Sequence, residues 1–298
     1  MRRLVAAVGF SRVATGYGRA VEMRSQLDRR EHGVGPRAAT DRPQRVRDTW
    51  LLRWREIGLL AACYVALTGI WSAIGWTIVH PLDDTEIVRT DTRLANWFVD
   101  RRTPALNDWS LFGSYLAETI VKIVVTAIIA GVLVWAVKRW LEALVVAVSL
   151  ILEAMVFITV TWIVARPRPD VEAVDASPVD TGFPSGHAAA AACYAAIAVV
   201  VFWHTRKRWI RALAVAFAVA MPIIVGVARL YRGMHYLTDV VAGVLLGATS
   251  VVLVTVIMCR AEDRRRSRQT DYRRAEVPDF VPADELAPPV VAAKGNAP

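Results

Sequence analysis

The segment TGFPSGHAAAAACYAAIAVVVFW, residues 181–203, joins a tight turn to a long apolar run. Pro184, Ser185 and Gly186 predict the turn, and the residues after them predict a helix with His187 in its first turn. Backbone N–H groups at a helix start have no partner inside the helix and favour an anion such as phosphate. A histidine placed there can transfer protons. The segment therefore predicts an apolar helix whose first turn is suited to phosphate binding.

Long apolar runs separated by charged segments make up most of the remaining chain. Of the 298 residues, 55% are hydrophobic, yet the formal net charge is +9. Runs of about 20 apolar residues can cross a bilayer core of roughly 30 Å. A basic balance in such a chain is typical of cytoplasmic loops, and the aromatic-interleaved basic patches of a nucleic-acid surface are absent from the sequence. The three cysteines fall in the apolar runs and predict neither a disulfide framework nor a zinc site.

The apolar runs predict an all-α polytopic membrane protein with six transmembrane helices. Their approximate limits are 57–79, 119–137, 141–165, 187–203, 209–227 and 237–259. Between the first two spans, residues 80–118 show helix-like apolar spacing and predict one or two amphipathic surface helices. Residues 57–260 thus form one membrane domain. Residues 1–56 are interpreted as a basic, largely disordered tail, and residues 261–298 as a second disordered tail.

The basic residues predict an orientation in which both termini are cytoplasmic. The basic tails, the pair Lys138 and Arg139, and the segment 206–208 then lie inside, while the acidic segments 80–118 and 170–180 lie outside. We expect an integral protein of the bacterial plasma membrane with its reactive side chains at the outer face. The span ends that meet there carry Arg168, His187, Arg229 and His235. Six spans also suit an inverted-repeat transporter, but the two halves show no repeat.

Two further motifs lie at the outer span ends. In TWIVARPRPDV the prolines end the third helix and present Arg166 and Arg168 at the membrane surface, where an arginine often serves only as an anchor. Arg229 is followed by His235 and Asp239. On a helix, the carboxylate of Asp239 could accept an imidazole N–H from His235 four residues earlier. This bond would fix the tautomer and leave the other ring nitrogen free as a nucleophile.

Together these motifs resemble the type-2 phosphatidic acid phosphatase family, the integral-membrane lipid phosphate phosphatases. The family pattern is K-x6-RP, PSGH and SR-x5-H-x3-D. This sequence matches it at Arg168-Pro169, at Pro184-Ser185-Gly186-His187, and at Arg229, His235 and Asp239. The resemblance covers about residues 57–260. This sequence departs from the family pattern at Thr161, where the family has a lysine, and at Ala228, where the family has a serine.

The resemblance implies a phosphatase that needs neither a metal nor a cofactor. Arg168 and Arg229 would bind the phosphate oxygens, together with backbone N–H groups at Ser185, Gly186 and His187. His235, oriented by Asp239, would attack phosphorus and form a phosphohistidine. His187 would protonate the leaving group and then activate water.

The implied partners are the bilayer and a lipid phosphate. Polyprenyl diphosphate, phosphatidate and phosphatidylglycerol phosphate all suit a site at headgroup depth. Vanadium haloperoxidases share this type of site, but they resemble soluble proteins, which six spans disfavour. The non-enzymatic alternative is a catalytically weakened family member that acts as a lipid-binding or interaction protein.

The missing lysine is the weak point of the expected site, because a charge-assisted contact contributes about 1.5–3 kcal/mol. Arg166 and Lys122 are the candidates to replace the cation lost at Thr161. Glu153 is expected near mid-membrane, about 22 Å along the helix from Arg168. We therefore assign Glu153 a packing role.

Overall fold

Every regular element in the described part of the chain is a helix. The computed structural model describes residues 53–137, 140–175 and 180–276. Its helices are α3 (Trp54–Val79), α4 (Glu86–Val99), α5 (Pro104–Tyr115), α6 (Thr119–Val137), α7 (Trp140–Val164), α8 (Gly186–Cys193), α9 (Ala195–His204), α10 (Arg208–Tyr231) and α11 (Leu237–Glu276). The all-α membrane fold predicted from the sequence is confirmed for these residues.

The number of membrane spans depends on how α5 and α6 are counted. Five segments of the described chain are long and apolar enough to cross a membrane, namely α3, α7, α8 with α9, α10 and α11. A sixth is obtained if α5 and α6, which are bent by 48° relative to each other, form one broken span. The sequence predicted α6 as a complete span and α5 as a surface helix.

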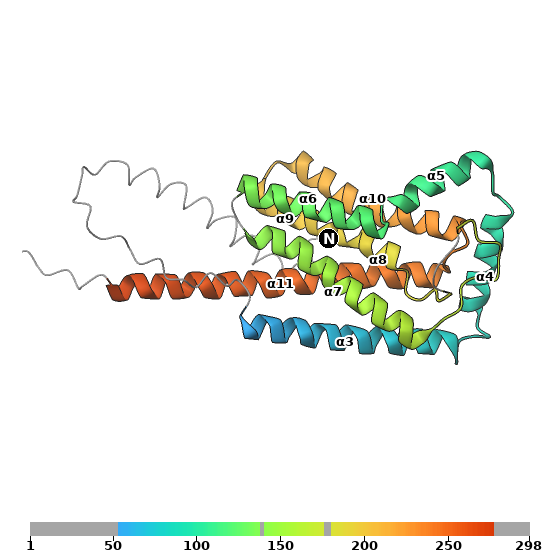
Figure 1. Cartoon of the computed structure of the whole chain (residues 1–298), viewed down its shortest axis with the longest axis horizontal. Coiled ribbons are helices and arrows are strands. Elements are labelled where there is room, and N and C mark those ends of the chain that lie inside the picture. The colour runs from blue at the N-terminus through green and yellow to red at the C-terminus, as the bar shows by residue number, and fades with distance from the viewer. Residues whose placement is uncertain (1–52, 138–139, 176–179, 277–298) are drawn as a thin grey trace, which may run out of the picture.

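The long helices run side by side, and the predicted motifs lie together at one end of the bundle. In Figure 1, α4 lies across that end, next to the ends of α3, α7 and α10. The loop before α8 and the turn before α11 belong to the same end. The common location of the motifs, which the topology predicted, is therefore found in the fold.

Helix α8 lies at the centre of the bundle and packs against α11, α10 and α7. Its alanines Ala188, Ala189 and Ala191 are completely buried. On α11, a Cβ atom at Gly243 would lie 2.3 Å from the carbonyl oxygen of Ser185, and one at Gly247 would lie 2.1 Å from that of Ala189. Only glycine allows such close approach, as in small-residue packing of membrane helices. The contact fixes the PSGH turn against the start of α11.

Helix α11 is longer than the sequence predicted. Residues 261–276 were expected in a disordered tail, but they continue the helix to Glu276. Ion pairs support this extension, because Arg264 contacts the buried Glu56 of α3 at 2.7 Å and Arg266 contacts Glu262 at 3.0 Å. The tail expectations for residues 1–52 and 277–298 lie outside the described residues.

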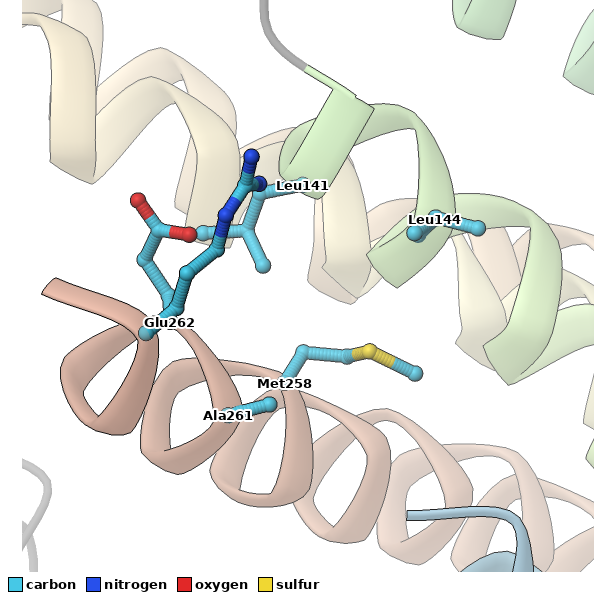
Figure 2. Close-up of a pocket in the computed structure, with 6 residues that line it drawn as sticks. Leu141, Leu144, Met258, Ala261 and Glu262 are labelled. Carbon is cyan, nitrogen blue, oxygen red and sulfur yellow. The ribbon is translucent and has the colours of Figure 1, made fainter. Parts of the chain in front are cut away.

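A small cavity separates the start of α7 from α11 at the end of the bundle opposite the motifs (Figure 2). Its lining includes Leu141, Met258 and Glu262. The cavity volume of about 10 Å³ is close to the space that one water molecule needs. It is too small for a lipid phosphate and lies at the end of the bundle opposite His187 and His235, so we do not assign the site to it.

Candidate active site

Three loop segments are tied together by backbone hydrogen bonds at the motif end. The N–H of Gly182 donates to the carbonyl of Arg166 at 2.7 Å, and the N–H of Ser185 donates to the carbonyl of Asp239 at 3.0 Å. An isolated antiparallel bridge joins Pro167 to Thr181. The RPRP segment, the PSGH turn and the start of α11 therefore form one connected unit.

The ends of α7 and α10 explain how the arginines and His235 reach this unit. Helix α7 stops at Val164, and Ala165 takes a φ of 47° before the prolines. Helix α10 ends at Tyr231, and Gly233 follows two residues later with a φ of 71°. The N–H of Gly233 donates to the carbonyl of Leu230, and that of Met234 donates to the carbonyl of Arg229. This pair of bonds is a Schellman motif, which requires a left-handed residue and so favours glycine. It turns the chain so that His235 faces the PSGH loop.

His235 is buried and makes a different bond from the one predicted. Its Nδ1 lies 2.8 Å from the carbonyl oxygen of Gly182, which can only accept, so Nδ1 carries the proton and Nε2 is left with its lone pair. Burial lowers the pKa of His235 well below its usual value, and the nearby Arg229 and Arg168 lower it further. Burial and the two arginines therefore favour the neutral imidazole, which is the form that a nucleophile needs.

Asp239 does not accept a hydrogen bond from His235, because its oxygens are used elsewhere. The closest distance between its Oδ2 and Nδ1 of His235 is 4.0 Å. Oδ1 instead accepts from Arg166 at 2.6 Å, and Oδ2 accepts from the N–H of Tyr236 at 2.9 Å. The expected i to i+4 geometry fails because α11 begins at Leu237, so that His235 lies before the helix. Asp239 is therefore linked to His235 through the backbone of the segment between them and not by a direct hydrogen bond.

Arg166 is an internal cation of this unit. It is 4% exposed and contacts the carboxylates of Asp91 and Asp239 at 3.0 and 2.6 Å. Its guanidinium also lies over the ring of Tyr236, 4.4 Å from the centroid. The two carboxylates raise its pKa against the effect of burial. Arg166 was expected as an auxiliary phosphate ligand, but its contacts commit it to the two aspartates.

Among the predicted phosphate-binding residues, Arg229 has an unused hydrogen-bond donor. It is 5% exposed, its Nη1 donates to Ser114 at 2.7 Å, and the same atom lies 3.5 Å from Asp175. Its Nε–H is buried and has no hydrogen-bond partner among the described residues. A buried donor without a partner costs about 1–3 kcal/mol, and an anion would relieve that cost.

Arg232 lies beside Arg229 and was missed in the sequence. Asp175 forms a two-point ion pair with it, and Ser110 accepts from it at 3.0 Å. The ion pair raises the pKa of Arg232 and, together with Arg229, lowers the pKa of Asp175. The only signal in the sequence is its position one helical turn after Arg229. Such a position does not distinguish a site residue from a surface arginine.

Arg168 contributes a third guanidinium. Its Nη1 donates to the carbonyl of Met234 at 2.7 Å, which ties it to the residue before His235. Burial lowers its pKa, while Asp239 and Asp180 raise it. Arg168 is therefore held next to the segment that carries His235, close enough for its charge to act on that ring.

The PSGH turn supplies part of what was predicted. His187 is partly exposed in the first turn of α8, and Ser185 is fully buried with an Oγ that has no partner in the described chain. The backbone N–H of Ser185 is not free for phosphate, since it donates to Asp239. A Cβ at Gly186 would lie 2.7 Å from the ring of Phe157, so glycine is needed there for packing.

The residues near the position of the missing lysine make few hydrogen bonds to the rest of the site. Thr161 is 8% exposed, and its Oγ1 has no partner among the described residues. Lys122 of α6 lines a cavity of about 10 Å³ with Ala190, one turn after His187. Glu153 is fully buried and neither of its carboxylate oxygens has a partner within the described residues. The packing role assigned to Glu153 stays a prediction.

A metal centre has no obvious ligands in this arrangement. Within residues 53–137, 140–175 and 180–276, no group of three or more His, Cys, Asp or Glu side chains has the geometry to hold a metal ion. The cations near His235 are the guanidinium groups of Arg168 and Arg229, and such groups bind phosphate oxygens by charge-assisted hydrogen bonds. The arrangement is therefore suited to an oxyanion.

Residues 142–263 match the family model of the PAP2 superfamily. This matching stretch runs from the first turn of α7 into α11 and holds all three motifs, so the match agrees with the resemblance that the motifs gave.

Among known proteins, the chain is 34% identical over 87 residues to the bacitracin transport permease protein BcrC of Bacillus licheniformis. That match covers 29% of this chain and 38% of BcrC, so it spans less than half of the relative. The fold is similar to that of the transmembrane PAP2-type phosphatidylglycerolphosphate phosphatase of Bacillus subtilis, with a TM-score of 0.52 and 20% identity. That alignment covers 71% of this chain and 98% of the other and supports the fold alone. The structure of Aquifex aeolicus LpxE aligns with a TM-score of 0.42 and 24% identity over 54% of this chain and 92% of the other.

Proposed function

We propose that the chain is a membrane lipid phosphatase that hydrolyses a phosphate monoester or diphosphate through a phosphohistidine. The observation that carries the proposal is the state of His235. Its Nδ1 is hydrogen-bonded to the carbonyl of Gly182, which leaves Nε2 to act as the nucleophile in the neutral ring that burial favours. Two cations, Arg168 and Arg229, lie nearby, and Arg229 has a buried donor with no partner among the described residues. A nucleophile next to guanidinium groups is the arrangement that phosphoryl transfer requires.

The first step forms a bond between Nε2 of His235 and phosphorus while the bond from phosphorus to the leaving oxygen breaks. The imidazole becomes a cation as its lone pair is shared, and the Nδ1 proton stays on Nδ1, where it remains hydrogen-bonded to the carbonyl of Gly182. Asp239 stabilises that positive charge at a distance of 4.0 Å without taking the proton. His187 donates a proton to the leaving oxygen.

In the second step His187 removes a proton from water, and the resulting oxygen attacks phosphorus. The N–P bond breaks, which returns the electron pair to Nε2 and releases inorganic phosphate. Arg168 and Arg229 would stabilise the equatorial oxygens in both steps. Both steps use residues of this chain alone.

The substrate class follows from where the site lies. The motif end of a membrane-spanning bundle is at headgroup depth, which suits the phosphate of a lipid in the bilayer. We assign this end to the outer face and both termini to the cytoplasm, since the basic segments then lie inside. Polyprenyl diphosphate, phosphatidate and phosphatidylglycerol phosphate are the lipids to compare.

Release of inorganic phosphate from these three lipids by purified protein tests the proposal. We expect turnover of at least one lipid, unchanged by EDTA, and a loss of more than about a thousandfold in His235→Ala. His204→Ala is a matched control, because that histidine contacts Glu142 at the opposite end of the bundle. Lipid binding without turnover would instead support the weakened family member. The specific observation for that alternative is Thr161, which stands in the place of a lysine and whose hydroxyl has no partner among the described residues.

A further inference from the structure

Helix α4 brings one buried carboxylate into the unit that holds His235. Asp91 lies in the middle of this helix, is 2% exposed, and belongs to the segment that precedes the PAP2-matching residues. Most other charged side chains of α4 are exposed, including the ion-paired Glu86 and Arg93. The burial of Asp91 therefore needs a specific reason, since an unpaired buried carboxylate is strongly unfavourable.

Asp91 is paired on both of its oxygens. Oδ2 accepts from Arg166 at 3.0 Å and from the hydroxyl of Thr238, and Oδ1 accepts from the backbone N–H of Thr238 at 3.1 Å. The hydroxyl of Thr238 also accepts from Arg166 at 2.7 Å. A carboxylate that accepts from the first turn of α11 acts as a cap for that helix, although it comes from a distant part of the chain.

The residues held by Asp91 are those that hold the reactive groups. Arg166 contacts Asp239, and the backbone carbonyl of Asp239 accepts from the N–H of Ser185 in the PSGH turn. The segment from Tyr236 to Asp239 follows directly on His235. A shift of Arg166 or of the first turn of α11 would therefore move His235 relative to the PSGH turn.

We propose that Asp91 is a positioning residue, which fixes Arg166 and the start of α11 so that His235 and His187 keep the alignment needed for phosphoryl transfer. The proposal rests on the function proposed above. The role proposed for Asp91 is limited to orientation, because Asp91 contacts neither histidine. Misplacement of reacting groups by about 1 Å can cost on the order of 100-fold in rate.

Steady-state kinetics of Asp91→Asn on the best lipid substrate tests this role. The amide keeps the shape but removes the charge that holds Arg166. We expect kcat to fall about 10- to 100-fold, with KM within twofold and an unchanged thermal unfolding midpoint. The matched control is Asp100→Asn, which alters an exposed aspartate at the end of the same helix and should leave kcat unchanged.

A second pair of variants keeps the test decisive if Asp91→Asn does not fold. Thr238→Val removes the bridging hydroxyl at nearly constant volume, and Thr238→Ser restores it. We expect kcat to fall in the valine variant and to recover in the serine variant. In the double variant of Asp91→Asn and Thr238→Val, the loss should be no larger than in the worse single variant, because both act on one network.

The outcomes separate this proposal from the function on which it rests. Wild-type protein without phosphatase activity would remove the function itself. An active wild type whose folded Asp91→Asn or Thr238→Val variant keeps full kcat would overturn the positioning role and leave the function standing. A lower unfolding midpoint with unchanged kcat would likewise reject it and assign Asp91 to stability alone.

Discussion

The two sides of the candidate site differ in how their charges are balanced. On the first side, Arg166 lies between two carboxylates, those of Asp91 and Asp239. On the second side, Arg229 and Arg232 share the single carboxylate of Asp175. The first side is a closed network that orients His235, whereas the second keeps a surplus of positive charge next to it. A site of this kind separates orientation from anion binding, and each can be changed without the other.

Among variants of the two sides, the largest loss of activity is expected when the positive charge of Arg229 is removed. Arg229→Met should lower kcat/KM by roughly 100- to 1000-fold, the loss typical for one donor to a developing oxyanion. Steady-state phosphate release measures this value. Arg93→Met, which removes an exposed arginine of α4, is the control and should stay within twofold of the wild type. Kinetics of Arg229→Met equal to those of the control would exclude a phosphate-binding role.

A smaller effect, on inhibition by phosphate, is expected when the carboxylate of Asp175 is removed from the second side. Asp175→Asn removes the negative charge that competes with phosphate for Arg229 and Arg232. Inorganic phosphate should then inhibit more strongly, with an inhibition constant lower by about fivefold, which corresponds to about 1 kcal/mol for a partly exposed pair. The exposed Asp108 of α5 supplies the control Asp108→Asn. Weaker inhibition in Asp175→Asn would mean that the carboxylate holds the arginines in place and does not compete.

The membrane helices were predictable because their signal is local. Apolar runs bounded by charges give the span limits to within a few residues, and the alternation of loops then brings Arg168, Arg229 and His235 to one end. The extension of α11 was not predictable in this way, because the pair between Arg264 and the distant Glu56 supports it. The number of spans also rests on the bend between α5 and α6, which apolar composition does not encode.

Two of the carboxylates that pair with the site arginines could not be recognised in the sequence. Asp91 and Asp175 lie in polar segments where an acidic residue is ordinarily solvated, and only tertiary packing selects them as partners of arginines. The spacing of His235 and Asp239 predicted a direct hydrogen bond. The imidazole N–H donates to the carbonyl of Gly182 instead, because the helix starts two residues after His235. Spacing identified the right residues but not the contacts between them.

The smallest effect is a shift in pH dependence that links the two sides through His235. The neutral imidazole is the reactive form, so activity is lost as the pH falls through the pKa of His235, which burial, Arg229 and Arg168 hold well below its usual value. In Arg168→Met one of these cations is gone, the protonated ring is less disfavoured, and the pKa of His235 rises. The acidic limb of kcat/KM should therefore move to higher pH, by about one unit or less. The ionisation of the lipid phosphate affects both proteins equally and cancels in the comparison. If the acidic limbs of kcat/KM coincide in the two proteins, the charge of Arg168 does not affect the pKa of His235. Arg168 would then act on the substrate alone.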